Sequence, residues 1–155
     1  PRVPGLADVV VVSSYPADLE YWQSIKPLDY AHMAVKPGGT VVLITPSPSG
    51  VSTMHPLFRE GGTWTYEETV RAVERGEVED LIAAGGLLIH AQIRERCEVV
   101  CYSDGMTEGD KEALGFRHAD SPQEALDMAL RSQGKDAKVG VLRVGEILPM
   151  VGGGR

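Results

Sequence analysis

Short apolar runs alternate along the chain with longer segments in which apolar residues recur every three or four positions. Four of the runs have the length and composition of buried β-strands, at residues 8–12, 40–45, 98–102 and 138–142. The segments between them have the helical period. Because strands that alternate with helices pair in parallel, the pattern predicts an α/β domain of three layers, with about four mostly parallel strands and helices on both faces.

Polar residues mark the start of several of the predicted helices. Thr65 and Glu68 have the spacing of a capping box, and Ser121 combines with Pro122 and Glu124 as an N-cap signal. The predicted helices span 65–75, 78–84, 87–96, 107–114 and 122–132, with Thr107 as the candidate cap of the fourth. Three of these lie between the second and third strands, with Gly85-Gly86 separating 78–84 from 87–96. This insertion is longer than a simple crossover requires, and it could cover the sheet or an interdomain face.

The first strand, helix and second strand form the unit around which the chain is organised. We expect the helix to start after Asp18 as its N-cap, and Pro27 either to kink it or to begin a second helix. In open parallel sheets of this Rossmann-like kind, ligands bind beyond the carboxyl ends of the strands. The segment from Tyr15 to Lys26 is therefore predicted to lie on the ligand side of the sheet.

Composition and charge narrow the classes of function. The 155 residues fit a single domain, and a net charge of −7 argues against a nucleic-acid partner. No apolar run approaches the ~20 residues of a membrane span, and no signal peptide is present, so we expect no membrane partner and a cytoplasmic location. Cys97 and Cys101 cannot form a disulfide framework, and we interpret both as small buried residues rather than metal ligands.

The ends of the sequence suggest an excised domain. The chain begins at Pro1 without a methionine, a few residues before a core strand. We therefore expect residues 1–155 to be one domain of a larger two-domain protein, with a linker at 1–6 and a disordered tail at 150–155. The other part of that protein would hold much of any active site.

Three histidines and one loop are weaker candidates. His32 is predicted on a helix surface away from the strand ends, and His90 in the core. His55, beside Pro56, could act as a ligand or base near the crevice, although a non-functional role is the more common one for such a residue. The loop 46–50 leaves a strand end with two hydroxyls and a glycine; an anion contact and a plain connector remain open there.

The usual motifs of nucleotide and hydrolase sites are absent. No Gly-x-Gly-x-x-Gly follows the first strand, and the chain has neither a phosphate-binding Lys-Ser/Thr loop nor a Gly-x-Ser-x-Gly elbow. Gln23 and Lys26, three residues apart, share one side of the first helix beside Trp22. An ammonium group with an amide beside it suits a carboxylate or hydroxyl, held by charge-assisted hydrogen bonds.

Residues 7–45 resemble the C-terminal domain of the nickel-pincer lactate racemase family, which contains 2-hydroxyacid racemases and epimerases. The resemblance rests on the order and spacing of four motifs: Tyr15-Pro16-x-Asp18, Trp22-Gln23-x-x-Lys26, Leu28-Asp29 and Val35-Lys36-Pro37-Gly38-Gly39. Beyond this stretch, only the order of the elements agrees, to about residue 149.

The resemblance implies substrate contacts at Gln23, Lys26, Trp22 and Tyr15, with no catalytic residue and no metal ligand in this chain. It further implies an N-terminal domain that carries the nickel-pincer nucleotide and the catalytic histidines, a small 2-hydroxyacid substrate, and a cleft on which this domain closes. The isolated chain should then be inactive. Trp22 replaces the family's usual tyrosine, so a hydroxyl contact is lost, which argues against lactate itself as the substrate. Ser13-Ser14 also replaces the usual Gly-Gly, as in a paralogue with a different substrate or a decayed site.

Two other classes remain open at this stage. The strand, the helix and Lys-Pro-Gly-Gly also resemble the late half of an S-adenosylmethionine-dependent methyltransferase, although the helical insertion fits that fold poorly. The third class is a non-catalytic α/β binding module in which Gln23 and Lys26 are merely exposed. The upstream sequence would separate the three. A histidine-rich segment with a lysine suits the racemase, an Asp/Glu-x-Gly-x-Gly loop suits the methyltransferase, and the absence of both would leave the binding module.

Overall fold

The computed structural model describes residues 2–145 and 149–152 of the chain. In chain order, its elements are β1 (Arg2–Val3), β2 (Ala7–Ser13), α1 (Tyr21–His32), β3 (Val35–Ile44), α2 (Leu57–Glu60), α3 (Tyr66–Glu74), α4 (Leu81–Arg96), β4 (Glu98–Tyr102), α5 (Glu108–Ala113), β5 (Arg117–His118), α6 (Pro122–Gln133), β6 (Val139–Leu142) and β7 (Met150–Val151).

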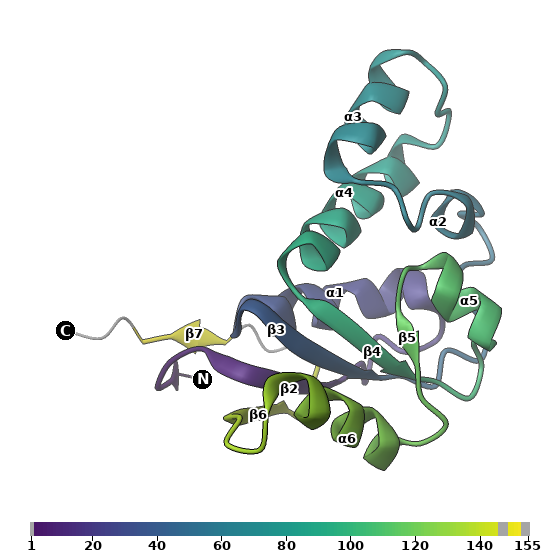
Figure 1. Ribbon diagram of the computed structural model, residues 1–155. Coiled ribbons are helices and arrows are strands. Elements are labelled where there is room, and N and C mark those ends of the chain that lie inside the picture. Colours follow the sequence, from purple (N-terminus) through teal and green to yellow (C-terminus); the bar gives the residue numbers. More distant parts are fainter. Residues whose placement is uncertain (1, 146–148, 153–155) are drawn as a thin grey trace.

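Five strands form one parallel sheet in the order β5-β4-β3-β2-β6 (Figure 1). The first long strand, β2, lies inside the sheet, with β3 on one side and β6 on the other. The predicted α/β class is therefore confirmed, with all four predicted strands present. The sequence missed β5 because its two residues, Arg117 and His118, are polar and too few to make an apolar run.

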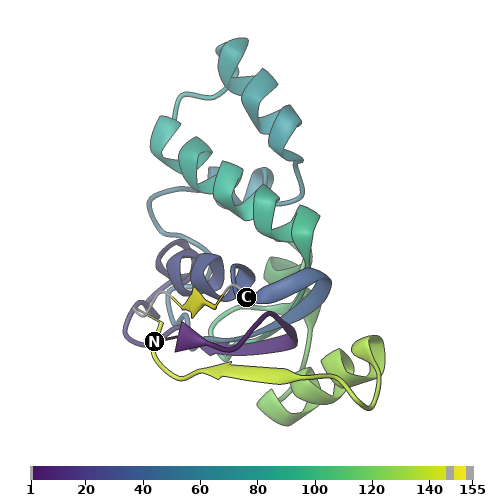
Figure 2. The same ribbon diagram turned by 90° about the vertical axis from the view of Figure 1, so that its left-hand side faces the viewer.

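Alternate residues of the central strands point to opposite faces of the sheet, as the period of a strand requires. Val10 and Val12 belong to a large core beneath α1 and α4, whereas Val9 and Val11 belong to a smaller core beneath α6. Figures 1 and 2 show α6 on one side of the sheet and α1 and α4 on the other. Both faces are thus covered, which parallel sheets generally require.

The insertion between β3 and β4 consists of α2, α3 and α4, and α3 with the start of α4 stands away from the sheet (Figure 1). The prediction of two helices separated by Gly85-Gly86 is wrong, because α4 runs through both glycines. A Cβ atom at Gly86 would lie 2.5 Å from the Phe58 ring and 2.6 Å from the Trp22 ring. Gly86 therefore allows two aromatic rings to approach the helix; it does not end it.

The first helix also differs from its prediction at two places. Its N-cap is Glu20 rather than Asp18, and no side chain caps it. The helix continues through Pro27, which therefore does not begin a second helix. Proline inside a helix removes one hydrogen bond and costs about 3 kcal/mol. Here the ring is buried against Gly145, where a Cβ atom would lie 2.7 Å from it, so packing offsets part of that cost.

The predicted helix caps of the other segments are confirmed. Thr65 and Thr107 form capping boxes at the starts of α3 and α5, with Glu68 and Asp110 as their partners. Ser121 accepts a hydrogen bond from the backbone N–H of Glu124 at the start of α6. Local sequence signals thus place three of the six described helices.

The two chain ends differ from the predicted linker and tail. Arg2–Val3 pairs in parallel with Met150–Val151, and the Gly152 N–H donates to the Val3 carbonyl at 2.9 Å. Main-chain hydrogen bonding between two distant segments orders residues that have no strand signal of their own. The remaining predicted tail residues, 153–155, and Pro1 lie outside the described residues. In the part of the chain that the structure describes, no helix combines the length and hydrophobicity needed to cross a membrane.

Candidate functional site

The start of α1 is held by the loop that follows β3. The backbone N–H groups of Tyr21 and Trp22 donate to the carbonyls of Gly50 and Val51, both at 3.0 Å, and the next two N–H groups donate to the Glu20 carbonyl. The free N–H groups at a helix start would otherwise form an anion site. In this domain, backbone carbonyl groups of the chain itself accept these hydrogen bonds in place of an anion.

Further hydrogen bonds fasten the same loop along the first crossover. The Glu20 carboxylate accepts from the backbone N–H of Thr53 at 2.8 Å and from its hydroxyl at 3.1 Å. Thr45 bridges Ser24 of α1 and Ser47 of the loop through hydroxyl bonds of 2.9 Å each. The loop 46–50 therefore lies beside the first crossover. The buried Ser47 hydroxyl serves the connector rather than an anion.

Gln23 and Lys26 form a pair on the outward side of α1. The Lys26 ammonium group donates to the Gln23 amide oxygen at 2.7 Å, on the exposed surface of the helix. The pair still presents the other ammonium hydrogens and the amide NH₂ group, which are donors suited to a carboxylate. Because α1 begins at the carboxyl ends of the strands, this pair in its first turns lies near that edge of the sheet.

Trp22 is half-buried and packs between elements. Its ring centroid lies 4.5 Å from that of His55 and 5.1 Å from that of Phe58, and the indole meets α4 at Gly86. The residue therefore takes part in the contact of α1 with α2 and α4. Its predicted contact with substrate remains a prediction.

Tyr15 lies in the turn after β2 and is 64% exposed. Its backbone carbonyl accepts a hydrogen bond from Gly145 at 2.8 Å, which fixes the turn against the segment after β6. The phenol ring thus stands on the surface at the carboxyl edge of the sheet. Its predicted role toward substrate also remains untested.

His55 has a partner that the sequence did not reveal. Its Nδ1 lies 2.7 Å from a carboxylate oxygen of Asp80, whose other oxygen accepts from the backbone N–H of Ala83 at the start of α4. These two hydrogen bonds, that from Ala83 first, lower the pKa of Asp80 and keep it a carboxylate. No local signal joins residues 25 positions apart, so only the fold brings this pair together.

The locations predicted for the other two histidines and the burial predicted for the two cysteines are confirmed. His32 lies near the end of α1, partly exposed, at the amino end of β3. His90 is buried, and burial lowers its pKa to about 4, so the ring is neutral. Cys97 and Cys101 are buried thiols whose pKa burial raises to about 12. Over residues 2–145 and 149–152, no three His, Cys, Asp or Glu side chains are arranged to hold a metal ion.

The fold and this edge define an α/β domain of the open parallel class, with a polar site framed by α1 and the loop after β3. A family model described as the lactate racemase C-terminal domain matches residues 4–147. The chain therefore belongs to this family. The methyltransferase interpretation is set aside.

Two solved structures are similar to the chain. The lactate racemase apoprotein from Thermoanaerobacterium thermosaccharolyticum is 24% identical with a TM-score of 0.78, and the match covers 96% of this chain and 36% of that one. A protein from Thermotoga maritima is 12% identical with a TM-score of 0.69, and the match covers 98% and 39%. Both similarities support the fold, and the chain spans less than two-fifths of either protein. Among curated protein sequences, none matches this chain.

Proposed function

We propose that this chain is the C-terminal domain of a 2-hydroxyacid racemase or epimerase, and that its Gln23–Lys26 pair binds the substrate carboxylate. The observation that carries the proposal is the hydrogen-bonded pair itself, near the carboxyl edge of the sheet in a member of this family. An ammonium group and an amide NH₂ can each donate to one oxygen of a carboxylate, which would fix the orientation of a small acid.

The surroundings of the pair suit this role. Trp22 lies one helical turn before Lys26, and its ring packs on His55 and Phe58, so an apolar surface stands beside the pair on α1. Exclusion of water strengthens a charge-assisted hydrogen bond, because the effective dielectric constant falls. The exposed ring of Tyr15 would contact the substrate or the partner domain from the turn after β2.

The nickel-pincer nucleotide that the resemblance implies would not be held mainly by this chain. The described residues offer no cluster of metal ligands, and the donors of the Gln23–Lys26 pair suit a carboxylate rather than nickel. We infer that a second domain supplies the cofactor, and that this domain contributes binding and orientation. The isolated 155-residue chain is accordingly expected to show no racemase activity.

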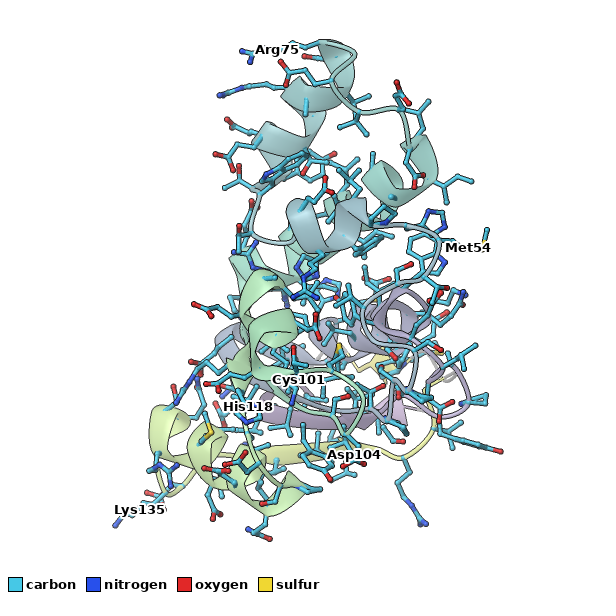
Figure 3. The ribbon with its side chains drawn as sticks, turned by 90° about the vertical axis from the view of Figure 1, so that its right-hand side faces the viewer. Met54, Arg75, Cys101, Asp104, His118 and Lys135 are labelled. Atoms are coloured by element: carbon cyan, nitrogen blue, oxygen red, sulfur yellow. The ribbon has the colours of Figure 1, made fainter. Side chains whose placement is uncertain are left out.

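The test is Lys26→Ala in the full-length protein, with kcat/KM for racemisation of 2-hydroxyacids as the measurement. Loss of the ammonium group should lower kcat/KM at least tenfold, which corresponds to ~1.4 kcal/mol of transition-state binding. Lys26→Arg should recover part of the loss. The matched control is Lys135→Ala, an exposed lysine that points away from the molecule beyond α6 (Figure 3).

Equal kinetics for Lys26→Ala and the control would remove the substrate role of the pair. If no 2-hydroxyacid is turned over by the full-length protein with its cofactor, the domain is a non-catalytic member of the family, and the proposal fails as a whole.

A further inference from the structure

The first three turns of α4 are apolar on nearly every side. Between Leu81 and Ala91, only His90 is polar. A helix of this kind is normally buried all round. In this chain, however, Leu81 is 64% exposed, Ile82 66% and Ile89 38%. One side of an apolar helix therefore faces solvent.

The exposed residues and the half-buried Leu88 share one side of the helix, and we call this side the α4 face. It consists of Leu81, Ile82, Gly85, Leu88 and Ile89, which recur at helical spacing. A Cβ atom at Gly85 would have no heavy atom within 4 Å, so the centre of the face is open. A glycine in an open position lets another backbone approach the helix closely.

The α4 face adjoins the candidate site through a chain of contacts. Asp80, the residue before α4, bonds His55, whose ring packs on Trp22. Trp22 in turn meets α4 at Gly86 and lies one helical turn before Lys26 on α1. Trp22 therefore separates the α4 face from the Gln23–Lys26 pair. Met54, 79% exposed, lies in the loop that the His55–Asp80 bond fastens to α4, and it points out into solvent in Figure 3.

We propose that the α4 face is the surface on which the N-terminal domain of the full-length protein docks. This proposal rests on the proposed function, because it assigns to the same partner domain a contact next to the Gln23–Lys26 pair. A single partner spanning Trp22 would cover the apolar face and approach the pair from one direction.

The partner that covers the α4 face is inferred from the small size of the face and from the two similar solved structures. A stable interface between separate proteins takes about 20–30 residues from each side, whereas the α4 face holds five. So small a surface suits a partner tethered in the same polypeptide, whose effective concentration is high. The matches cover only 36% and 39% of the two similar solved chains, so each of those proteins has further polypeptide, in the same chain, beyond the part that resembles this domain. A net charge of −7 opposes self-association of this chain.

Cysteine labelling tests the proposal without reference to activity. Ile82→Cys is introduced into the 155-residue chain and into the full-length protein, and the rate of maleimide labelling is measured in each. We expect labelling at least tenfold slower in the full-length protein. Val141→Cys is the matched control: Val141 is 63% exposed, on the opposite face of the sheet, and should label at equal rates in both. The native thiols are buried, with pKa values of about 12, and do not compete.

Equal labelling of Ile82→Cys in the two proteins would overturn the proposal. Slower labelling of the 155-residue chain with rising concentration would overturn it too, since a second copy would then cover the face. Protection of the α4 face in a protein without racemase activity would leave docking in place and reject the proposed function alone. If Lys26→Ala lowers kcat/KM but Ile82→Cys is not protected in the full-length protein, the docking proposal fails and the proposed function stands.

Discussion

The two sides of α1 differ in how tightly their polar groups are held. On the inner side, Tyr21 is fully buried, and its hydroxyl lies 2.6 Å from Nδ1 of His90. On the outer side, Gln23 and Lys26 bond mainly to each other on an exposed surface. The inner pair is fixed by the packing around it, whereas the outer pair can rearrange toward a ligand. One helix thus carries a packed polar pair and an exposed one, and the proposed function assigns recognition to the exposed pair.

On the inner side of α1, Tyr21 and His90 form a hydrogen-bond network in which both ring nitrogens of His90 have a partner. The His90 ring is neutral, so its Nδ1 accepts from Tyr21 while Nε2–H donates to the carbonyls of Gly62 and Leu114 at 2.8 and 3.0 Å. The rings of Phe58 and Phe116 pack edge-on against Tyr21. Fully satisfied networks in a low-dielectric core are rigid, and protonation disrupts them.

The largest effect that we predict comes from acid acting on this inner side. Burial lowers the pKa of His90 from 6.5 to about 4, so the unfolded state binds the proton first. Stability should therefore fall as pH decreases from about 6.5 toward 4, by up to ~3 kcal/mol. Chemical denaturation of the 155-residue chain across this range measures it. His90→Gln, which cannot titrate, should remove this part of the pH dependence of the unfolding free energy. An unchanged pH dependence would show that His90 is not the group responsible.

A smaller effect distinguishes the two neighbouring glycines of α4. Gly86→Ala places a methyl group against the rings of Phe58 and Trp22, and we expect a loss of about 1–2 kcal/mol from overpacking. Gly85→Ala enters open space and should stabilise the domain by about 0.5–1 kcal/mol, because alanine is the better helix former. Thermal unfolding of both variants measures the difference. Equal shifts would mean that Gly86 is not a packing position.

The smallest effect concerns the outer side of α1. Gln23→Ala with Lys26→Ala should change the unfolding free energy of the 155-residue chain by less than about 0.5 kcal/mol, as is usual for exposed substitutions. Denaturant titration is the measurement. A larger loss would show that the pair supports the fold, and the contrast between the two sides of α1 would no longer hold.

Much of the fold could be predicted because its signals are local. The apolar runs predicted every strand of the main sheet except β5, and Thr65, Thr107 and Ser121 marked three helix starts. Gly85-Gly86 misled the prediction because local glycine content favours a break, whereas packing on Phe58 and Trp22 favours a continuous helix. The pairing of β1 with β7 joins opposite ends of the chain and leaves no local signal.

The candidate site could be predicted only in part for the same reason. The Gln23–Lys26 contact follows from a spacing of three residues in a helix, and the structure contains it. The partner of His55 lies 25 residues away, and the carbonyls that bond the first turn of α1 lie about 29 residues away, so neither could be predicted from periodicity. Long-range hydrogen bonds of this kind depend on the finished fold.

The closure of the α1 start by the loop after β3 has a consequence for how ligand selectivity can change. In many domains of this architecture, the backbone at this point attracts phosphate, and that attraction cannot be removed without rebuilding the turn. Here the backbone is already engaged. Any recognition of charge at this edge therefore depends on side chains, which single substitutions can change while the sheet beneath stays intact.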